Sequence, residues 1–124
     1  MTQPLALVLY EKLLPGSQLV NRLQDLNYRV QTLADPALLV ESAEQARPML
    51  VLADLEPAPE KVCAGISRLR QNPATQHLPV IAVGADNATD LQAAARMAGA
   101  SLVVSEAAIL NHLEQFLEQA LHLE

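Results

Sequence analysis

Aromatic residues, cysteine and positive charge are all scarce in this sequence. Its 124 residues include two tyrosines, one phenylalanine and no tryptophan, although 51% are hydrophobic. The core must therefore be built from leucine, valine, isoleucine and alanine, which suits helices packed in layers over a parallel sheet. The length is that of one ordinary domain, so we expect residues 1–124 to form a single domain without metal or disulfide support.

Several protein classes are excluded by what is missing. A single cysteine, Cys63, cannot form an internal disulfide and suits a reducing compartment. Only 8 basic residues stand against 14 acidic ones, without a basic cluster, so we do not expect nucleic-acid binding. No apolar run approaches the roughly 20 residues of a membrane span, and the first residues lack the features of a signal peptide. The sequence predicts a cytoplasmic protein with no membrane segment.

Short, unbroken apolar runs mark the expected strands. Continuous rather than alternating apolarity indicates strands that are buried on both faces, as in a parallel sheet. A fifth and weaker strand is predicted over Tyr28 to Leu33. The four strong runs are Leu5 to Leu9, Met49 to Ala53, Val80 to Val83 and Leu102 to Val104.

Helical spacing of apolar residues appears between these runs. The first helix is expected after Pro15 and Gly16, with Ser17 as its N-cap and an apolar stripe that extends to Leu26. Asp35 is expected to cap the second. Gly99 is expected to end the alanine-rich fourth, and the last carries one apolar stripe from Ile109 to Leu121. The second, third and fourth helices are predicted over about residues 36–46, 60–70 and 88–98.

Strands and helices thus alternate five times along the chain. Right-handed crossovers place helices on both faces of one sheet, giving an α/β, doubly wound (βα)5 three-layer sandwich. Working groups in such sheets lie beyond the carboxyl ends of the strands. The positions to inspect are therefore Tyr10, Glu11, Asp54, Glu56, Gly84, Ser105 and Glu106.

Asp54 is the most informative of these residues, because it directly follows a buried strand and is expected to emerge at the open edge. A carboxylate there can act as a nucleophile towards a phosphoryl group or as a ligand for a hard cation. Glu11 leaves the first strand at the same edge, and the repulsion between two carboxylates favours a divalent metal. An aspartate at this position can equally begin a turn or cap the next helix.

A resemblance that spans most of the chain bears on this choice. Residues 72–85, residues 97–104 and the strand Val51-Leu-Ala-Asp-Leu-Glu-Pro57 resemble the corresponding parts of response-regulator receiver domains. The resemblance implies a flavodoxin-like fold with strand order 2-1-3-4-5 and a role in two-component phosphorelay signalling. It also implies that Asp54 is the phosphoacceptor, and that Glu11, Asp54 and the main-chain carbonyl of Glu56 would hold Mg²⁺. Tyr10 takes the place of the family's first acidic residue.

The chain departs from the family at the residues that respond to phosphorylation. Gly84 replaces a threonine or serine, Ser105 replaces a lysine and Leu102 replaces an aromatic residue. Phosphoryl transfer depends on neutralising charge around the transferred group. A charge-assisted hydrogen bond contributes about 1.5 to 3 kcal/mol. We therefore predict weak Mg²⁺ binding or none, and a degenerate receiver (a pseudo-receiver) that acts through protein contacts rather than catalysis.

Two other interpretations stay open. The first is a working but atypical receiver, phosphorylated on Asp54 with Mg²⁺, in which Lys12 replaces the missing cation. The second is a small flavodoxin-like enzyme or cofactor carrier, which would need a sizeable apolar pocket. The expected partner is a histidine kinase or downstream signalling protein, or a second copy of the chain, bound through the face formed by the fourth helix, the fifth strand and the last helix.

Overall fold

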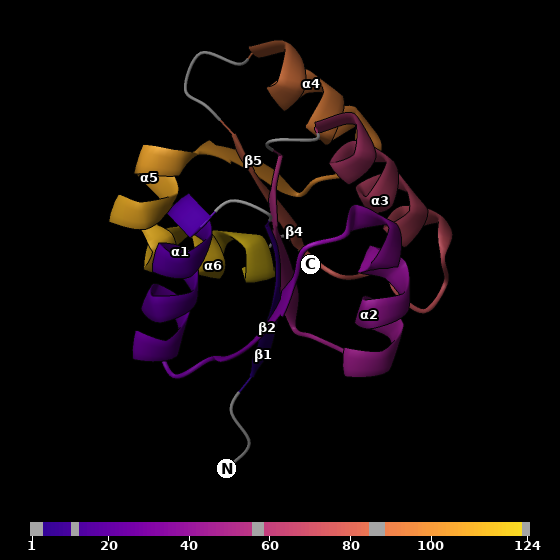
Figure 1. Cartoon of the computed structure of the whole chain (residues 1–124). Coiled ribbons are helices and arrows are strands. Elements are labelled where there is room, and N and C mark those ends of the chain that lie inside the picture. Colours follow the sequence, from indigo (N-terminus) through magenta and orange to yellow (C-terminus); the bar gives the residue numbers. More distant parts are fainter. Residues whose placement is uncertain (1–3, 11–12, 56–58, 85–88, 123–124) are drawn as a thin grey trace.

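The structure is a computed structural model that describes residues 4–10, 13–55, 59–84 and 89–122. These residues form a five-stranded, all-parallel sheet with the strand order β2-β1-β3-β4-β5 (Figure 1). Both the α/β class and the predicted strand order are confirmed. None of the described helices is long and apolar enough to cross a membrane.

The three inner strands owe their position to apolar continuity. Every residue of β3 and β4 is buried, whereas β2 exposes Arg29, Gln31 and Thr32 at one edge of the sheet. That difference explains why the β2 run was the weakest of the five signals. The strands are β1 (Leu5–Leu9), β2 (Arg29–Leu33), β3 (Leu50–Asp54), β4 (Val80–Gly84) and β5 (Leu102–Ser105).

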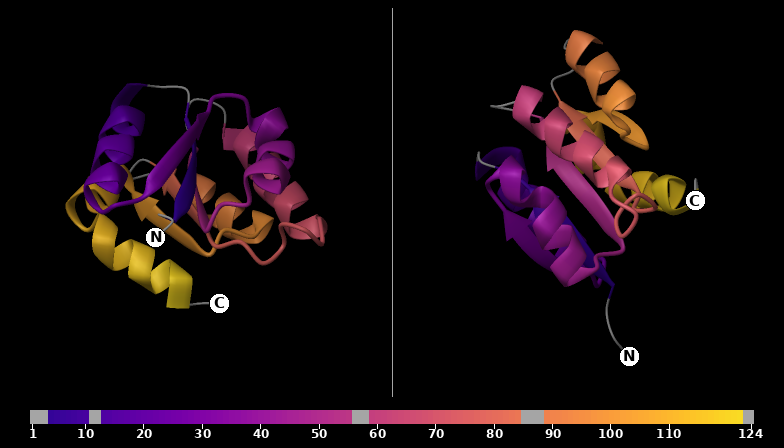
Figure 2. Two further views of the ribbon diagram at one scale, coloured as in Figure 1. Left: turned by 90° about the horizontal axis from the view of Figure 1, so that it is seen from below. Right: turned by 90° about the vertical axis from the view of Figure 1, so that its right-hand side faces the viewer.

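Helices cover both faces of the sheet, as right-handed crossovers require. Figure 1 shows α1, α5 and α6 on one face and α2, α3 and α4 on the other, and Figure 2 shows the same layers from two further sides. The helices are α1 (Leu13–Asp25), η1 (Pro36–Leu38), α2 (Leu39–Ala46), α3 (Pro59–Gln71), α4 (Thr89–Ala98), α5 (Glu106–Asn111) and α6 (Leu113–His122).

Two apolar cores result from the alternation of side chains along each strand. On the α2/α3/α4 face, Leu7, Val51 and Ala82 pack against Ile66 of α3 and Ala95 of α4. On the opposite face, alternate residues of the strands pack against α1, α5 and α6. This second core includes Val8, Leu52, Ile81, Leu19, Leu23, Ile109, Leu113 and Leu117. The predicted aliphatic core is confirmed.

Two helix signals from the sequence are confirmed in detail. Asp35 accepts a hydrogen bond from the amide of Ala37 at 2.9 Å and caps η1, which leads directly into α2. Gly99 has φ of 120°, and the amide of Ala100 donates to the Ala95 carbonyl at 3.0 Å, the reversal that ends many helices.

The prediction that Ser17 caps the first helix is wrong. Helix α1 already begins at Leu13, so Pro15, Gly16 and Ser17 all lie within its first turns. Proline is tolerated there because the first amides of a helix have no intrahelical carbonyl partner. The helix also ends at Asp25, before Leu26, and the chain reverses at Asn27 with φ of 69°.

The prediction of one continuous last helix is also wrong. The chain bends at His112, whose φ and ψ of −131° and 33° separate α5 from α6. Asparagine and histidine, which stand at the bend, are both weaker helix formers than the alanines and leucines around them. The apolar stripe survives the bend, because Ile109, Leu113 and Leu117 remain buried in the same core.

Candidate functional site

The strand register brings the predicted site positions to one edge of the sheet. Leu9 pairs with Ala53, so Tyr10 and Asp54 are neighbours at the ends of β1 and β3. Asp54 pairs with Val83 of β4, and the next residue, Gly84, pairs with Ser105 of β5. The carboxyl ends of four adjacent strands therefore carry the aspartate and three of the positions at which the sequence departs from receivers.

Asp54 is buried, contrary to the prediction that it emerges at the open edge. It is the last residue of β3 rather than the first after it, and only 3% of its surface is exposed. The central position of β3 between β1 and β4 explains this burial, as does the following residue, Leu55, which is fully buried. A buried carboxylate requires compensation by hydrogen bonds or charge, which makes Asp54 more than an ordinary turn residue.

Gly84 lies against the side chain of Leu55. The Leu55 amide donates to the Val83 carbonyl at 2.8 Å, so the Leu55 backbone lies beside the end of β4. A Cβ atom on residue 84 would lie 3.3 Å from Leu55 Cδ1. The chain therefore lacks a hydroxyl at this position and also fills part of the space that a larger side chain would need.

Ser105 has a local structural role. Its hydroxyl oxygen accepts a hydrogen bond from the Ala108 amide at 3.1 Å and caps the amino terminus of α5. Leu102, at the start of β5, is half-buried and packs in the α1/α5/α6 core. Neither residue offers a cation to a phosphoryl group.

The described residues supply few ligands for a divalent cation. Tyr10 contributes a half-buried phenol, and its amide donates to the Leu33 carbonyl at 2.8 Å. Glu11 and Glu56 lie outside the described residues. Within the described part of the chain, no group of three His, Cys, Asp or Glu side chains is placed to hold a metal. Of the three predicted Mg²⁺ ligands, only Asp54 lies within the described residues.

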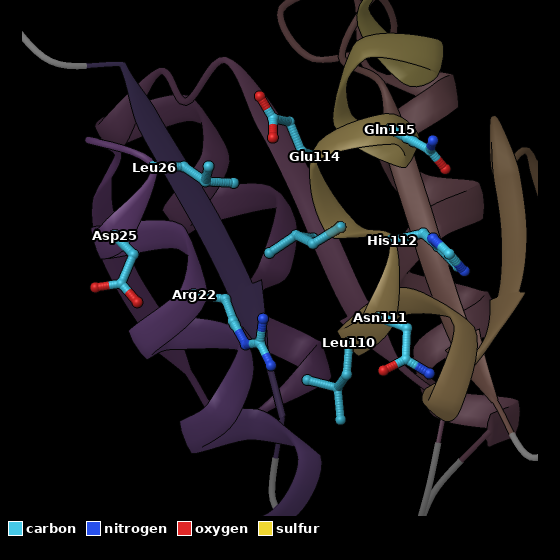
Figure 3. Close-up of a pocket in the computed structure, with 9 residues that line it drawn as sticks. Arg22, Asp25, Leu26, Leu110, Asn111, His112, Glu114 and Gln115 are labelled. Atoms are coloured by element: carbon cyan, nitrogen blue, oxygen red, sulfur yellow. The ribbon is translucent and has the colours of Figure 1, made fainter.

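A surface hollow of about 370 Å³ lies between the end of α1 and the bend from α5 to α6. Figure 3 shows Arg22 of α1 and Leu110 of α5 on facing sides of it, while His112 points away from α1. Because the last turn of α1 leads to the amino end of β2, the hollow lies away from the edge that carries Asp54. Asp54 is not among the residues that line this hollow, so the hollow is not a ligand pocket next to the aspartate.

Arg70, near the end of α3, was not identified from the sequence. Its guanidinium donates to the carbonyls of Gly99, Gln76 and Leu78 at 2.7, 2.6 and 2.6 Å. It also donates to the Ser101 hydroxyl at 3.1 Å. These partners are distant in the sequence and mostly main-chain atoms, so no residue pattern indicates them.

The fold of this chain matches solved structures, whereas its sequence matches no family model or curated protein. No family model matches the sequence, and no curated protein matches it. Solved structures of response-regulator receiver domains do match it, over nearly the whole chain. The chain therefore has the fold of response-regulator receiver domains, as the resemblance predicted.

Three of these structures are representative. The receiver domain of the sensor histidine kinase PA1611 from Pseudomonas aeruginosa, which has a magnesium ion in its active-site cleft, is 20% identical with a TM-score of 0.86; 98% of this chain and 99% of that chain are covered. The chemotaxis response regulator CheY4 of Vibrio cholerae is 17% identical with a TM-score of 0.83, covering 96% and 99%. A protein assigned as a response regulator in Chloroflexus aurantiacus is 18% identical with a TM-score of 0.89, covering 98% and 99%.

Proposed function

We propose that this chain is a single receiver-like domain of two-component phosphorelay signalling in the cytoplasm, and that its phosphorylation switch is impaired. It acts by binding another protein rather than by catalysis. The observation that carries the proposal is the receiver fold with Asp54 at the end of β3, beside Gly84 and Ser105 at the ends of β4 and β5.

The contacts of the two substituted positions support an impaired switch. A ligand shifts a conformational equilibrium only if it contacts the two states differently. Gly84 has no side chain to contact a phosphoryl group on Asp54, and Leu55 packs against it. Ser105 stands where receivers have a lysine, and its neutral hydroxyl caps α5. It therefore cannot neutralise the negative charge of a phosphoryl group on Asp54. A phosphoryl group on Asp54 would therefore make few stabilising contacts with the ends of β4 and β5.

The surface beside these strands supports a role in protein binding. Helix α4 exposes Ala93, Ala94 and 89% of Met97, and it lies next to the edge strand β5. Small side chains let a partner backbone approach closely, and an exposed methionine adapts to different contact surfaces. We propose that a histidine kinase, a downstream signalling protein or a second copy of the chain binds the face formed by α4, β5 and the predicted last helix, which the structure divides into α5 and α6 (the α4/β5/α5 surface).

Labelling with acetyl phosphate tests this proposal directly. The chain is incubated with acetyl phosphate and millimolar Mg²⁺, and phosphorylation is measured by intact mass, with Asp54→Asn as the control. We expect little or no phosphate on Asp54. Stoichiometric phosphorylation that Asp54→Asn abolishes would favour the atypical working receiver, for which the retained aspartate is the supporting observation.

A further inference from the structure

The end of α4 is held in place by contacts that involve three separate segments. Gly99 ends the helix, and Ser101 begins the return to β5, where its amide donates to the Val80 carbonyl at 2.8 Å. The Ser101 hydroxyl oxygen in turn accepts from the Val80 amide at 3.2 Å. The connection from α4 to β5 is therefore tied to the first residue of β4.

Arg70 joins this connection to α3. Its Nε donates to the Gly99 carbonyl and its Nη2 to the Ser101 hydroxyl, while Nη1 donates to the Gln76 and Leu78 carbonyls of the segment before β4. Arg70 is partly buried as a residue, and the planar array of donors on its guanidinium matches several fixed acceptors at once. One side chain thus connects α3, the segment before β4 and the segment after α4.

The fit between Gly99 and Arg70 is close. A Cβ atom on residue 99 would overlap with Arg70 Cγ, and it would lie 3.1 Å from Arg70 Nε. Gly99 therefore provides both the positive φ that reverses the chain and the space that the arginine stem occupies. Because an arginine stays protonated at any physiological pH, these contacts do not depend on a titration.

We propose that Arg70 is a positioning residue that fixes the α4–β5 connection, so that the α4 and β5 part of the binding surface keeps one arrangement without phosphorylation. The second half of this statement rests on the function proposed above. The first half rests only on the contacts of Arg70. Gly84 and Ser105 offer few contacts to a phosphoryl group, so phosphorylation would do little to move this surface. A surface that is already in its binding conformation does not need that movement, because the competent state is populated at all times.

Amide hydrogen exchange measured by NMR tests the positioning role. The variants are Arg70→Lys, which keeps the charge but loses the planar donors, and Arg70→Gln, which loses both. Arg68→Gln, an exposed arginine on the same helix, is the matched control. We expect exchange of the Val80, Gly99, Ala100 and Ser101 amides to accelerate by about ten- to a hundredfold in the Arg70 variants, the loss that about one charge-assisted hydrogen bond represents. The control leaves these rates unchanged.

The pattern of exchange decides the outcome. Unchanged rates at these four amides in both Arg70 variants would contradict the proposal. An equal acceleration at the Leu7 and Leu52 amides of β1 and β3 would contradict it too, since Arg70 would then stabilise the whole domain. Arg70→Lys decides the question if Arg70→Gln does not fold. Large phosphorylation-dependent changes at α4 in the wild-type chain would overturn the proposed function and the surface that is fixed without phosphorylation, but not the local role of Arg70.

Discussion

At the scale of single residues, the candidate site is defined by what surrounds Asp54. The carboxylate is buried at the centre of the sheet edge, while the two strands beyond it end in Gly84 and Ser105. Receivers have a threonine or serine where this chain has Gly84. Adding such a side chain would also disturb Leu55, which packs against the glycine.

We predict that Gly84→Thr destabilises the chain by about 1 to 3 kcal/mol, the usual cost of overpacking a buried site. The new Cβ would lie 3.3 Å from Leu55 Cδ1, which is tighter than an ordinary van der Waals contact, and Leu55 is fully buried. Leu55→Val removes the δ carbons, so the same substitution costs less in that background. Urea denaturation of the two single variants and the double variant measures the difference.

Ile81→Val is the control for this cycle. Ile81 also loses one methylene, but it packs in the α1/α5/α6 core, whereas Leu55 packs in the α2/α3/α4 core. Gly84→Thr and Ile81→Val should therefore have additive effects on the free energy of unfolding. Additivity with Leu55→Val as well would show that the contact between Gly84 and Leu55 carries no energy.

The sequence predicted where Asp54 lies but not how deeply it is buried. An apolar run followed by an aspartate indicates a strand end, and the register confirms that position. Burial depends on β3 being the central strand and on the complete burial of the next residue, Leu55, which are properties of the assembled sheet. The identities of Gly84 and Ser105 were readable directly, whereas their contacts were not.

At the scale of elements, α5 is a short helix that begins with a cap and ends at a bend. The prediction of one long helix failed because the apolar stripe continues through His112 while the backbone does not. Periodicity records which side chains face the core, and two helices joined at an angle can satisfy the same pattern. The start of α1 was missed for a related reason, since proline and glycine usually indicate a turn.

We predict that Ser105→Ala lowers the free energy of unfolding by about 1 kcal/mol through loss of the N-cap. The Ser105 hydroxyl oxygen accepts from the Ala108 amide at 3.1 Å, and alanine offers no acceptor. Ser105→Asp supplies a carboxylate oxygen and should restore most of the stability. Urea denaturation compares the three chains. Equal stability of Ser105→Ala and the wild type would exclude the capping role.

At the scale of the whole molecule, burial of two weak acids gives stability a dependence on alkaline pH. Burial raises the pKa of the Cys63 thiol and of the Tyr28 phenol. Both groups therefore ionise more readily in the unfolded chain, so their contribution is complete below the unfolded pKa and is lost as the pH rises through the folded pKa.

We predict that the free energy of unfolding falls with pH above about 8.5, where an unfolded cysteine begins to ionise. Urea denaturation between about pH 7 and pH 10.5 measures the slope. Cys63→Ala should flatten the first part of the decline, and Tyr28→Phe should flatten the part near the tyrosine pKa. A decline that is equally steep in both variants would mean that other groups cause it.

The order of strands and helices was the most predictable property of the molecule. Continuous apolar runs, short connections and right-handed crossovers leave few arrangements for a chain of this kind, and the sheet has the expected order. Arg70 marks the limit of that reasoning. Its acceptors are the main-chain carbonyls of residues 76, 78 and 99 and the Ser101 hydroxyl, which become neighbours only in the folded chain.

The central claim is that the receiver fold is intact while its response to phosphorylation is impaired. The most direct test is a titration of the isotope-labelled chain with beryllofluoride and Mg²⁺, which together mimic a phosphoryl group on the aspartate. We predict that amide shifts in the NMR spectrum change at most near Asp54, and that those of α4 and β5 stay in place. Saturable, large shifts throughout α4 and β5, absent in Asp54→Asn, would contradict the claim.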